Sequence, residues 1–175
     1  MKLPFLKSVP GEDPVVVEGV FNTSATRLFR AWTTPDEIVR WFGPGDTPLL
    51  SARVDPRKGG LWEFAYSERD GVQDVMSGEY VLVVQDEQLI FTWRHERRFS
   101  SGNVETTSPS LVTVIFEDAN GGARLRLRHE RIVREGGRLG VGDGWSRSFS
   151  KLQRLVEDLA VDRQGNGPSG KASRR

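Results

Sequence analysis

The chain has 175 residues, which is enough for one domain with a sizeable core but too few for two independent cores. Its 25 Lys and Arg residues against 24 Asp and Glu residues give a formal net charge of +1, which excludes a strong overall field toward nucleic acid or an anionic membrane. Cysteine is absent, so disulfide frameworks, thiolate metal sites and cysteine nucleophiles are excluded as well.

The chain ends predict location and domain limits. Residues 1–13 contain lysine but no uninterrupted apolar stretch, so they are not typical of a secretory signal. No apolar run approaches the roughly 20 residues that a membrane-spanning helix needs. We therefore expect a cytoplasmic protein with a short extension over 1–13, one domain over 14–161, and a disordered basic tail over 162–175, which is rich in Gly, Ser and cations.

The first predicted elements are a strand and two short helices. A run of valines interrupted by one acid predicts a strand over 15–21. Ser24 is placed to cap a first helix, and Thr34-Pro35-Asp36-Glu37 supplies an N-cap, a proline at N1 and an acid at N3 for a second. The second helix is expected to end at 41–45, WFGPG, because its glycines and proline do not continue a helix.

From residue 50 onward the hydrophobic period changes to two, as in strands. Residues 61–66 and 89–95 place large aromatic side chains on one face, which we take as the inner face. Residues 123–130 alternate arginine with leucine and histidine, so His129 is expected to point inward. The turn at 120–122, NGG, joins this strand to the preceding one as a hairpin. No helical segment interrupts the strands, so we expect an antiparallel meander.

The last long element is a helix over 140–160. Its apolar side chains are spaced by four, three, four and three residues, which places them on one stripe: Trp145, Phe149, Leu152, Val156 and Leu159. This helix must cover the concave face of the sheet almost alone. We therefore expect it to leave an internal cavity of roughly 300 to 1,000 Å³.

Six short motifs follow one another along the chain: AWTTP (31–35), WFGP (41–44), RKGGLW (57–62), GEY (78–80), FTW (91–93) and GW (144–145). In this order they resemble the Activator of Hsp90 ATPase homologue 1-like family, which belongs to the Bet v 1-like, or START-like, helix-grip superfamily. The resemblance covers about 15–159. It implies an α+β fold in which a seven-stranded antiparallel sheet wraps around the C-terminal helix and an apolar cavity, with two short helices between the first two strands.

The resemblance says less about activity, since the superfamily includes lipid carriers, hormone-binding proteins, polyketide cyclases and a co-chaperone, and a shared fold does not choose among them. The co-chaperone works with an additional N-terminal domain. Here 14 residues precede the first predicted strand, so we do not expect direct contact with Hsp90.

The favoured function is the binding of a small hydrophobic or aromatic ligand in the cavity, without catalysis and without a cofactor. The candidate ligand-binding residues are mainly inward-facing aromatic side chains: Trp41, Trp62, Phe64, Tyr66, Tyr80, Phe91, Trp93, His129, Trp145 and Phe149. We expect no nucleic-acid partner and no membrane insertion.

Two alternatives remain open at this point. In a cyclase- or aromatase-like enzyme, His129 or Tyr66 would move protons, although an inward histidine is more often a packed core residue. In an interaction module, a chaperone-related partner or a second copy of the chain would bind a sheet edge or the arginine face of residues 124–128. His95 is expected at a strand end, and the two histidines lack the further ligands that a metal needs, so no metal is predicted.

Overall fold

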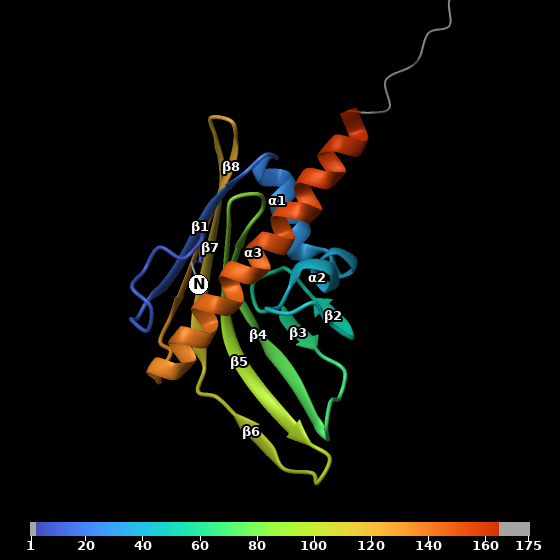
Figure 1. The fold of residues 1–175 in the computed structure, drawn as a ribbon, viewed down its shortest axis with the longest axis vertical. Coiled ribbons are helices and arrows are strands. Elements are labelled where there is room, and N and C mark those ends of the chain that lie inside the picture. The colour runs from blue at the N-terminus through green and yellow to red at the C-terminus, as the bar shows by residue number, and fades with distance from the viewer. Residues whose placement is uncertain (1–2, 165–175) are drawn as a thin grey trace, which may run out of the picture.

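The computed structural model describes residues 3–164, with side chains as far as Glu157. Figure 1 shows a curved sheet with one long helix across it and two short helices beside that helix. In chain order the elements are β1 (Val15–Phe21), α1 (Ala25–Thr33), α2 (Pro35–Trp41), β2 (Ser51–Val54), β3 (Leu61–Ala65), β4 (Val72–Val84), β5 (Gln88–Phe99), β6 (Val104–Thr106), β7 (Ser110–Ala119), β8 (Gly122–Glu130) and α3 (Glu135–Gln164). The predicted α+β helix-grip architecture is confirmed.

All neighbouring strands in the sheet are antiparallel, in the order β1-β8-β7-β5-β4-β3-β2. These are the seven expected strands. An eighth, β6, pairs with β5 off this path. The sequence did not predict β6 because its three residues are exposed and too few to show a period.

The register places inward-facing side chains in rows across the sheet. One row runs from Phe91 through Val112 and His129 to Val15, and all four side chains are buried. On the other face of β8 the arginines are exposed and paired with acids; the side chain of Arg128, for example, lies 2.9 Å from Glu130. The alternation in β8 therefore separates a dry inner face from a wet outer face, as predicted.

The two short helices begin where the sequence predicted. The Ser24 side chain accepts a hydrogen bond from the backbone N–H of Arg27 at 3.1 Å, which caps α1. Thr34 occupies the N-cap of α2 and Pro35 follows at the first turn, but the Thr34 side chain makes no capping hydrogen bond. Proline's fixed φ and the acids of the first turn therefore support the start of α2.

Helix α3 is longer than predicted, because it starts at Glu135 rather than at residue 140 and continues to Gln164. Five glycines among its first ten residues lower the helix propensity, which is why the sequence pattern favoured a later start. Arg138 secures this start: its Nε donates to the carbonyl of Gly11 at 2.5 Å and its Nη1 to that of Ile132 at 2.9 Å.

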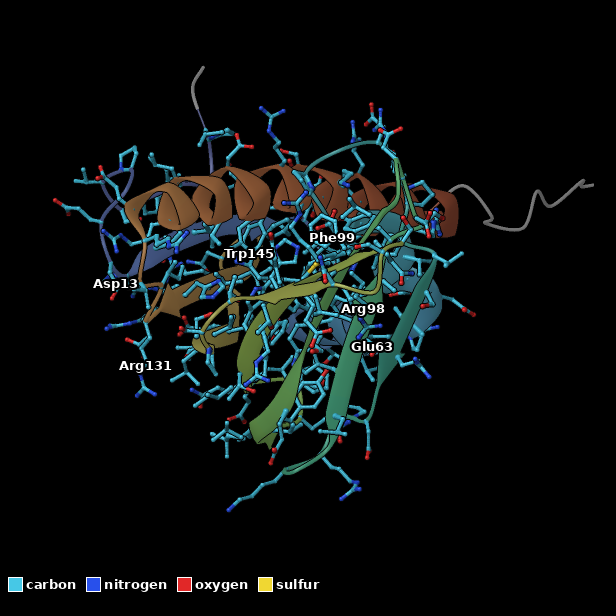
Figure 2. The ribbon with its side chains drawn as sticks, turned by 90° about the horizontal axis from the view of Figure 1, so that it is seen from below. Asp13, Glu63, Arg98, Phe99, Arg131 and Trp145 are labelled. Atoms are coloured by element: carbon cyan, nitrogen blue, oxygen red, sulfur yellow. The ribbon has the colours of Figure 1, made fainter. Side chains whose placement is uncertain are left out.

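The apolar stripe of α3 faces the sheet as predicted, since Trp145, Phe149, Leu152 and Val156 are all buried. Figure 2 shows α3 as a layer over the sheet with Trp145 between the two. The side chain of Leu159 lies outside the described residues. Of the predicted tail, residues 162–164 belong to α3, and residues 165–175 lie outside the described part of the chain. No helix in the described part is long and apolar enough to cross a membrane.

The glycines of α3 generate a stability prediction. A Cβ built on Gly140 would meet no atom within 4 Å, so Gly140→Ala should stabilise the protein by about 0.5–1 kcal/mol through helix propensity. Urea denaturation followed by circular dichroism measures this change. The matched control is Gly78→Ala, whose Cβ would collide with the carbonyl oxygen of Thr92 and should destabilise. A loss of stability in Gly140→Ala would mean that this part of the chain is not helical in solution.

Candidate functional site

The centre of the molecule is a small void between the sheet, α3 and the two short helices. Its lining residues define what we call the aromatic cavity: Trp32, Trp41, Trp62, Phe64, Tyr80, Leu89, Phe91, Trp93 and Trp145. All five tryptophans of the chain are among them. The volume of the aromatic cavity is about 10 Å³, which is no more than one water molecule occupies. The predicted cavity of several hundred cubic ångströms is therefore wrong.

The aromatic rings themselves fill the space. Trp32 from α1 stacks on Trp145 from α3, with ring centroids 5.6 Å apart and planes 20° apart. Trp41 from α2 lies 4.8 Å from Trp32 on another side. The prediction fails because the stripe of α3 is not the main filler of the concave face: the two short helices contribute rings that occupy the hollow.

The structure brings seven of the ten predicted ligand-binding residues together. Those that line the aromatic cavity are Trp41, Trp62, Phe64, Tyr80, Phe91, Trp93 and Trp145. Tyr66, His129 and Phe149 lie outside the lining. Phe149 instead packs against Phe5 and Phe21, with ring centroids 5.7 and 5.9 Å away.

Sequence reasoning missed two lining residues, Trp32 and Leu89. Leu89 shares the inner face of β5 with Phe91 and Trp93, so the alternation of that strand could have identified it. Trp32 lies on the buried face of α1, and the sequence alone gave no reason to place that face against the cavity.

His129 is the centre of a buried chain of hydrogen bonds. Trp145 Nε1–H donates to His129 Nδ1 at 3.1 Å, so Nδ1 carries no proton and the neutral ring carries its proton on Nε2. Nε2 lies 2.7 Å from Ser110 Oγ, whose hydroxyl donates to the carbonyl of Trp93 at 3.3 Å. Each polar side chain in this series has a hydrogen-bond partner. The series attaches α3 to three strands of the sheet, β8, β7 and β5.

Burial lowers the pKa of His129 from 6.5 to about 3, because the charged ring would lose its hydration and find no anionic partner. Both ring nitrogens are also occupied. His129 is therefore held neutral at physiological pH, and the arrangement is that of a structural core histidine rather than of a general base.

Tyr66 lies beside the cavity with its hydroxyl buried and without a hydrogen-bond partner among the described residues. Burial, and secondly the charge of Asp74, raise the pKa of Tyr66 to about 12. The hydroxyl packs against the backbone of Gly43, where any Cβ would collide with it and where φ is +101°. Glycine at 43 therefore allows the loop after α2 to lie on Tyr66.

The cavity comes nearest to solvent at Phe64 and Trp93, which are half-buried, whereas the other lining side chains are buried. Phe42 covers this pair, with ring centroids 4.9 Å from Phe64 and 5.9 Å from Trp93. Phe42 begins the loop 42–50, which we call the cover loop. Phe42 therefore packs directly on the two half-buried rings of the lining.

Hydrogen bonds from α3 hold the cover loop in place. Ser148 Oγ accepts from the backbone N–H of Gly43 at 3.0 Å, and Lys151 Nζ donates to the carbonyls of Phe42 at 3.4 Å and of Gly45 at 2.6 Å. Partial burial lowers the pKa of Lys151, while the carboxylate of Asp46 opposes that shift. The loop is thus fastened by polar contacts at the rim of the cavity.

His95 lies inside β5 rather than at a strand end, because β5 continues to Phe99; its Nε2 is 2.8 Å from Asp74 Oδ1, and it does not line the cavity. Across the described residues, no group of three or more His, Asp or Glu side chains is arranged to hold a metal ion. Arg57 is exposed and pairs with Asp55 at 2.8 Å.

Comparison with known proteins identifies the family. The family model described as Activator of Hsp90 ATPase homolog 1-like protein matches residues 22–157, which is most of the chain. The chain belongs to this family. No curated protein matches the sequence.

Several solved structures share the fold. A protein from Nitrosomonas europaea superposes with a TM-score of 0.68 at 18% identity, covering 85% of this chain and 96% of that one. An AHSA1 protein from Silicibacter pomeroyi gives a TM-score of 0.68 at 23% identity, with coverage of 85% and 99%. A protein of unknown function from Staphylococcus aureus gives 0.64 at 16% identity, with coverage of 85% and 95%. At these identities the likeness establishes the helix-grip fold alone.

The buried histidine predicts a pH dependence of stability. Between pH 6.5 and about 3 the unfolded chain binds a proton at His129 and the folded protein does not, so stability falls as the pH falls, by about 1.4 kcal/mol per pH unit from this residue. His129→Gln should be less stable near neutral pH by about 1–3 kcal/mol. The stability difference between wild type and variant should then shrink below pH 6.

Chemical denaturation at a series of pH values measures this difference directly, and subtraction of the two curves removes the contribution of the carboxylates that both proteins share. A difference that stays constant between pH 7 and pH 4 would show that His129 is not held neutral by the fold.

Proposed function

We propose that this protein binds a small hydrophobic or aromatic molecule in the aromatic cavity, between the sheet and α3, and does not act on it chemically. The observation that carries the proposal is the convergence of all five tryptophans on one void whose described lining has no charged side chain. Aromatic rings bury large areas and offer flat faces and polar edges to a flat guest. Such a lining favours a ligand with an apolar surface over a charged ligand.

The guest must take the place of a ring, since the void itself is about 10 Å³. Moving one phenylalanine from the interior into water costs about 1.5–3 kcal/mol. A guest of two or three fused rings offsets this cost because it buries a larger apolar area in the same place. The favoured binding mode is therefore exchange of a protein ring for a ligand ring.

Phe42 is the ring that geometry selects for this exchange. It covers the half-buried Phe64 and Trp93, and it lies on the cover loop, whose residues 44–48 are exposed. The hydrogen bonds from Ser148 and Lys151 can re-form with water when the loop lifts. Lifting the loop would open the cavity without unfolding the sheet.

The titratable groups in and around the lining support binding over catalysis. General acid–base catalysis needs a group that titrates near the working pH. The pKa of His129 is lowered to about 3, and the pKa of Tyr66 is raised to about 12. Burial, and secondly Asp55, also raise the pKa of Tyr80, the phenol of the lining. None of these groups exchanges protons readily near neutral pH.

Intrinsic fluorescence tests the proposal directly, because every tryptophan lines the cavity. A panel of fatty acids, flavonoids and polyaromatic compounds should contain members that change the emission, and calorimetry should give their dissociation constants. Trp93→Ala should weaken binding of such a compound about tenfold or more through lost aromatic contact. The matched control is Phe5→Leu, which removes another half-buried ring but outside the cavity lining.

The control should reduce stability and leave affinity within about twofold of wild type. If no compound of the panel binds the wild-type protein, or if the two variants weaken binding equally, the aromatic cavity is not a ligand site.

The route of entry is tested at Lys151. Lys151→Met keeps the apolar stem and removes the hydrogen bonds to the carbonyls of Phe42 and Gly45. Removing these hydrogen bonds should destabilise the closed position of the cover loop by about 1 kcal/mol. The open population of the loop, and with it the association rate of the ligand, should then rise about fivefold. Stopped-flow fluorescence measures the rate. Lys58→Met, at an exposed turn, should not change it; equal rates in both variants would place the entrance elsewhere.

A further inference from the structure

A buried polar atom of a lining residue has no hydrogen-bond partner in the part of the chain that the structure describes. Trp32 is 5% exposed, and its Nε1 is buried without a hydrogen bond among the residues that the structure describes. Three other tryptophans of the lining donate their indole N–H to acceptors in the protein: Trp41 to the carbonyl of Ala31 at 2.9 Å, Trp62 to that of Thr92 at 3.1 Å, and Trp145 to His129 Nδ1 at 3.1 Å. Buried indole N–H groups usually find a partner, so the exception requires an explanation.

Four aromatic rings of the described chain lie against Trp32. They are Trp41 at 4.8 Å, Trp145 at 5.6 Å, Phe116 at 6.1 Å and Phe149 at 6.5 Å between ring centroids. Ring faces are weak acceptors compared with an oxygen. A single water is a poor solution as well, because a buried water needs two to four polar partners and the lining is almost entirely hydrocarbon.

We propose that Trp32 determines the ligand class: the guest is a neutral, flat molecule with a carbonyl or ether oxygen, and that oxygen accepts the hydrogen bond of Trp32 Nε1. This inference rests on the proposed function and specifies it. A guest that fills the cavity satisfies the unpaired donor and buries its apolar surface in the same event. A hydrocarbon of the same shape leaves the donor unpaired.

The absence of charged side chains from the described lining disfavours anionic guests. Among the described residues, neither arginine nor lysine nor histidine lines the cavity, so a carboxylate bound there would be dehydrated without a cation to compensate it. Free fatty acids and aromatic acids should therefore bind more weakly than neutral compounds of the same size.

Fluorene and fluorenone form a matched pair of probes, since both are flat tricyclic molecules and the second carries one carbonyl group. Wild-type protein should bind fluorenone about tenfold more tightly than fluorene, as measured by calorimetry. In Trp32→Phe, which keeps a ring and removes the N–H, that preference should fall to less than twofold. A carboxylic acid derivative of fluorenone should bind at least tenfold more weakly than fluorenone itself.

A second measurement needs no variant that has to fold. The indole N–H signals of ¹⁵N-labelled wild-type protein report the five tryptophans separately, and the Trp32 signal should shift downfield on addition of fluorenone but not of fluorene. In the calorimetric comparison the control variant is Trp62→Phe: the N–H of Trp62 is already bonded to the carbonyl of Thr92, so its loss should weaken the binding of both probes alike.

The outcomes distinguish the two proposals. If both probes bind with the same affinity, or if Trp32→Phe weakens both equally and the Trp32 signal does not respond to fluorenone, the role of Trp32 is wrong while ligand binding stands. If neither probe nor any other aromatic compound binds, the proposed function fails and this inference fails with it.

Discussion

The position of α3 on the sheet depends on one buried chain of hydrogen bonds, from Trp145 through His129 and Ser110 to the carbonyl of Trp93. The apolar stripe of the helix contributes more free energy, but apolar contact is not directional and would tolerate a rotated or shifted helix. The hydrogen-bond chain does not tolerate such a shift of the helix, because breaking the chain leaves several polar groups unsatisfied in a medium of low dielectric constant. It therefore fixes the Trp145 ring, and that ring forms the side of the aromatic cavity that α3 provides.

With Trp145 fixed, the remaining space is defined by rings that arrive from separate parts of the chain. Trp32 stacks on Trp145 from α1, and Phe42 approaches the same ring edge-on from the cover loop at 5.8 Å. A close-packed interior of this kind resists small displacements and responds to larger ones by moving whole side chains between discrete positions. The proposed exchange of rings relies on that property: the cover loop is exposed over residues 44–48 and attached by hydrogen bonds from α3, while the buried Phe42 supplies the ring that would have to move.

The features that follow from local periodicity were predictable. The period of two in residues 123–130 placed His129 inside, and the spacing of apolar residues defined the buried face of α3. The features that depend on three-dimensional packing were not. The volume of the cavity depends on how rings from α1, α2 and three strands interlock, and the partner of His129, Ser110, is an ordinary serine in the sequence. The early start of α3 depends on the anchoring contacts of Arg138, which overcome the unfavourable glycines.

The same rings hold the protein together and form the proposed binding site, so stability and affinity are linked. A guest that binds only the folded state raises stability in proportion to the logarithm of its concentration over its dissociation constant. The energy released is reduced by the contacts that the displaced ring gives up, so a tightly packed cavity binds its guest more weakly than a preformed one of the same chemistry would. In the proposed complex the N–H of Trp32, which has no partner among the described residues, acts in the opposite direction, because the folded protein carries the cost of that group until an acceptor binds. Packing thus sets how tightly any flat guest can bind, and a single unsatisfied donor can decide which flat guest is preferred.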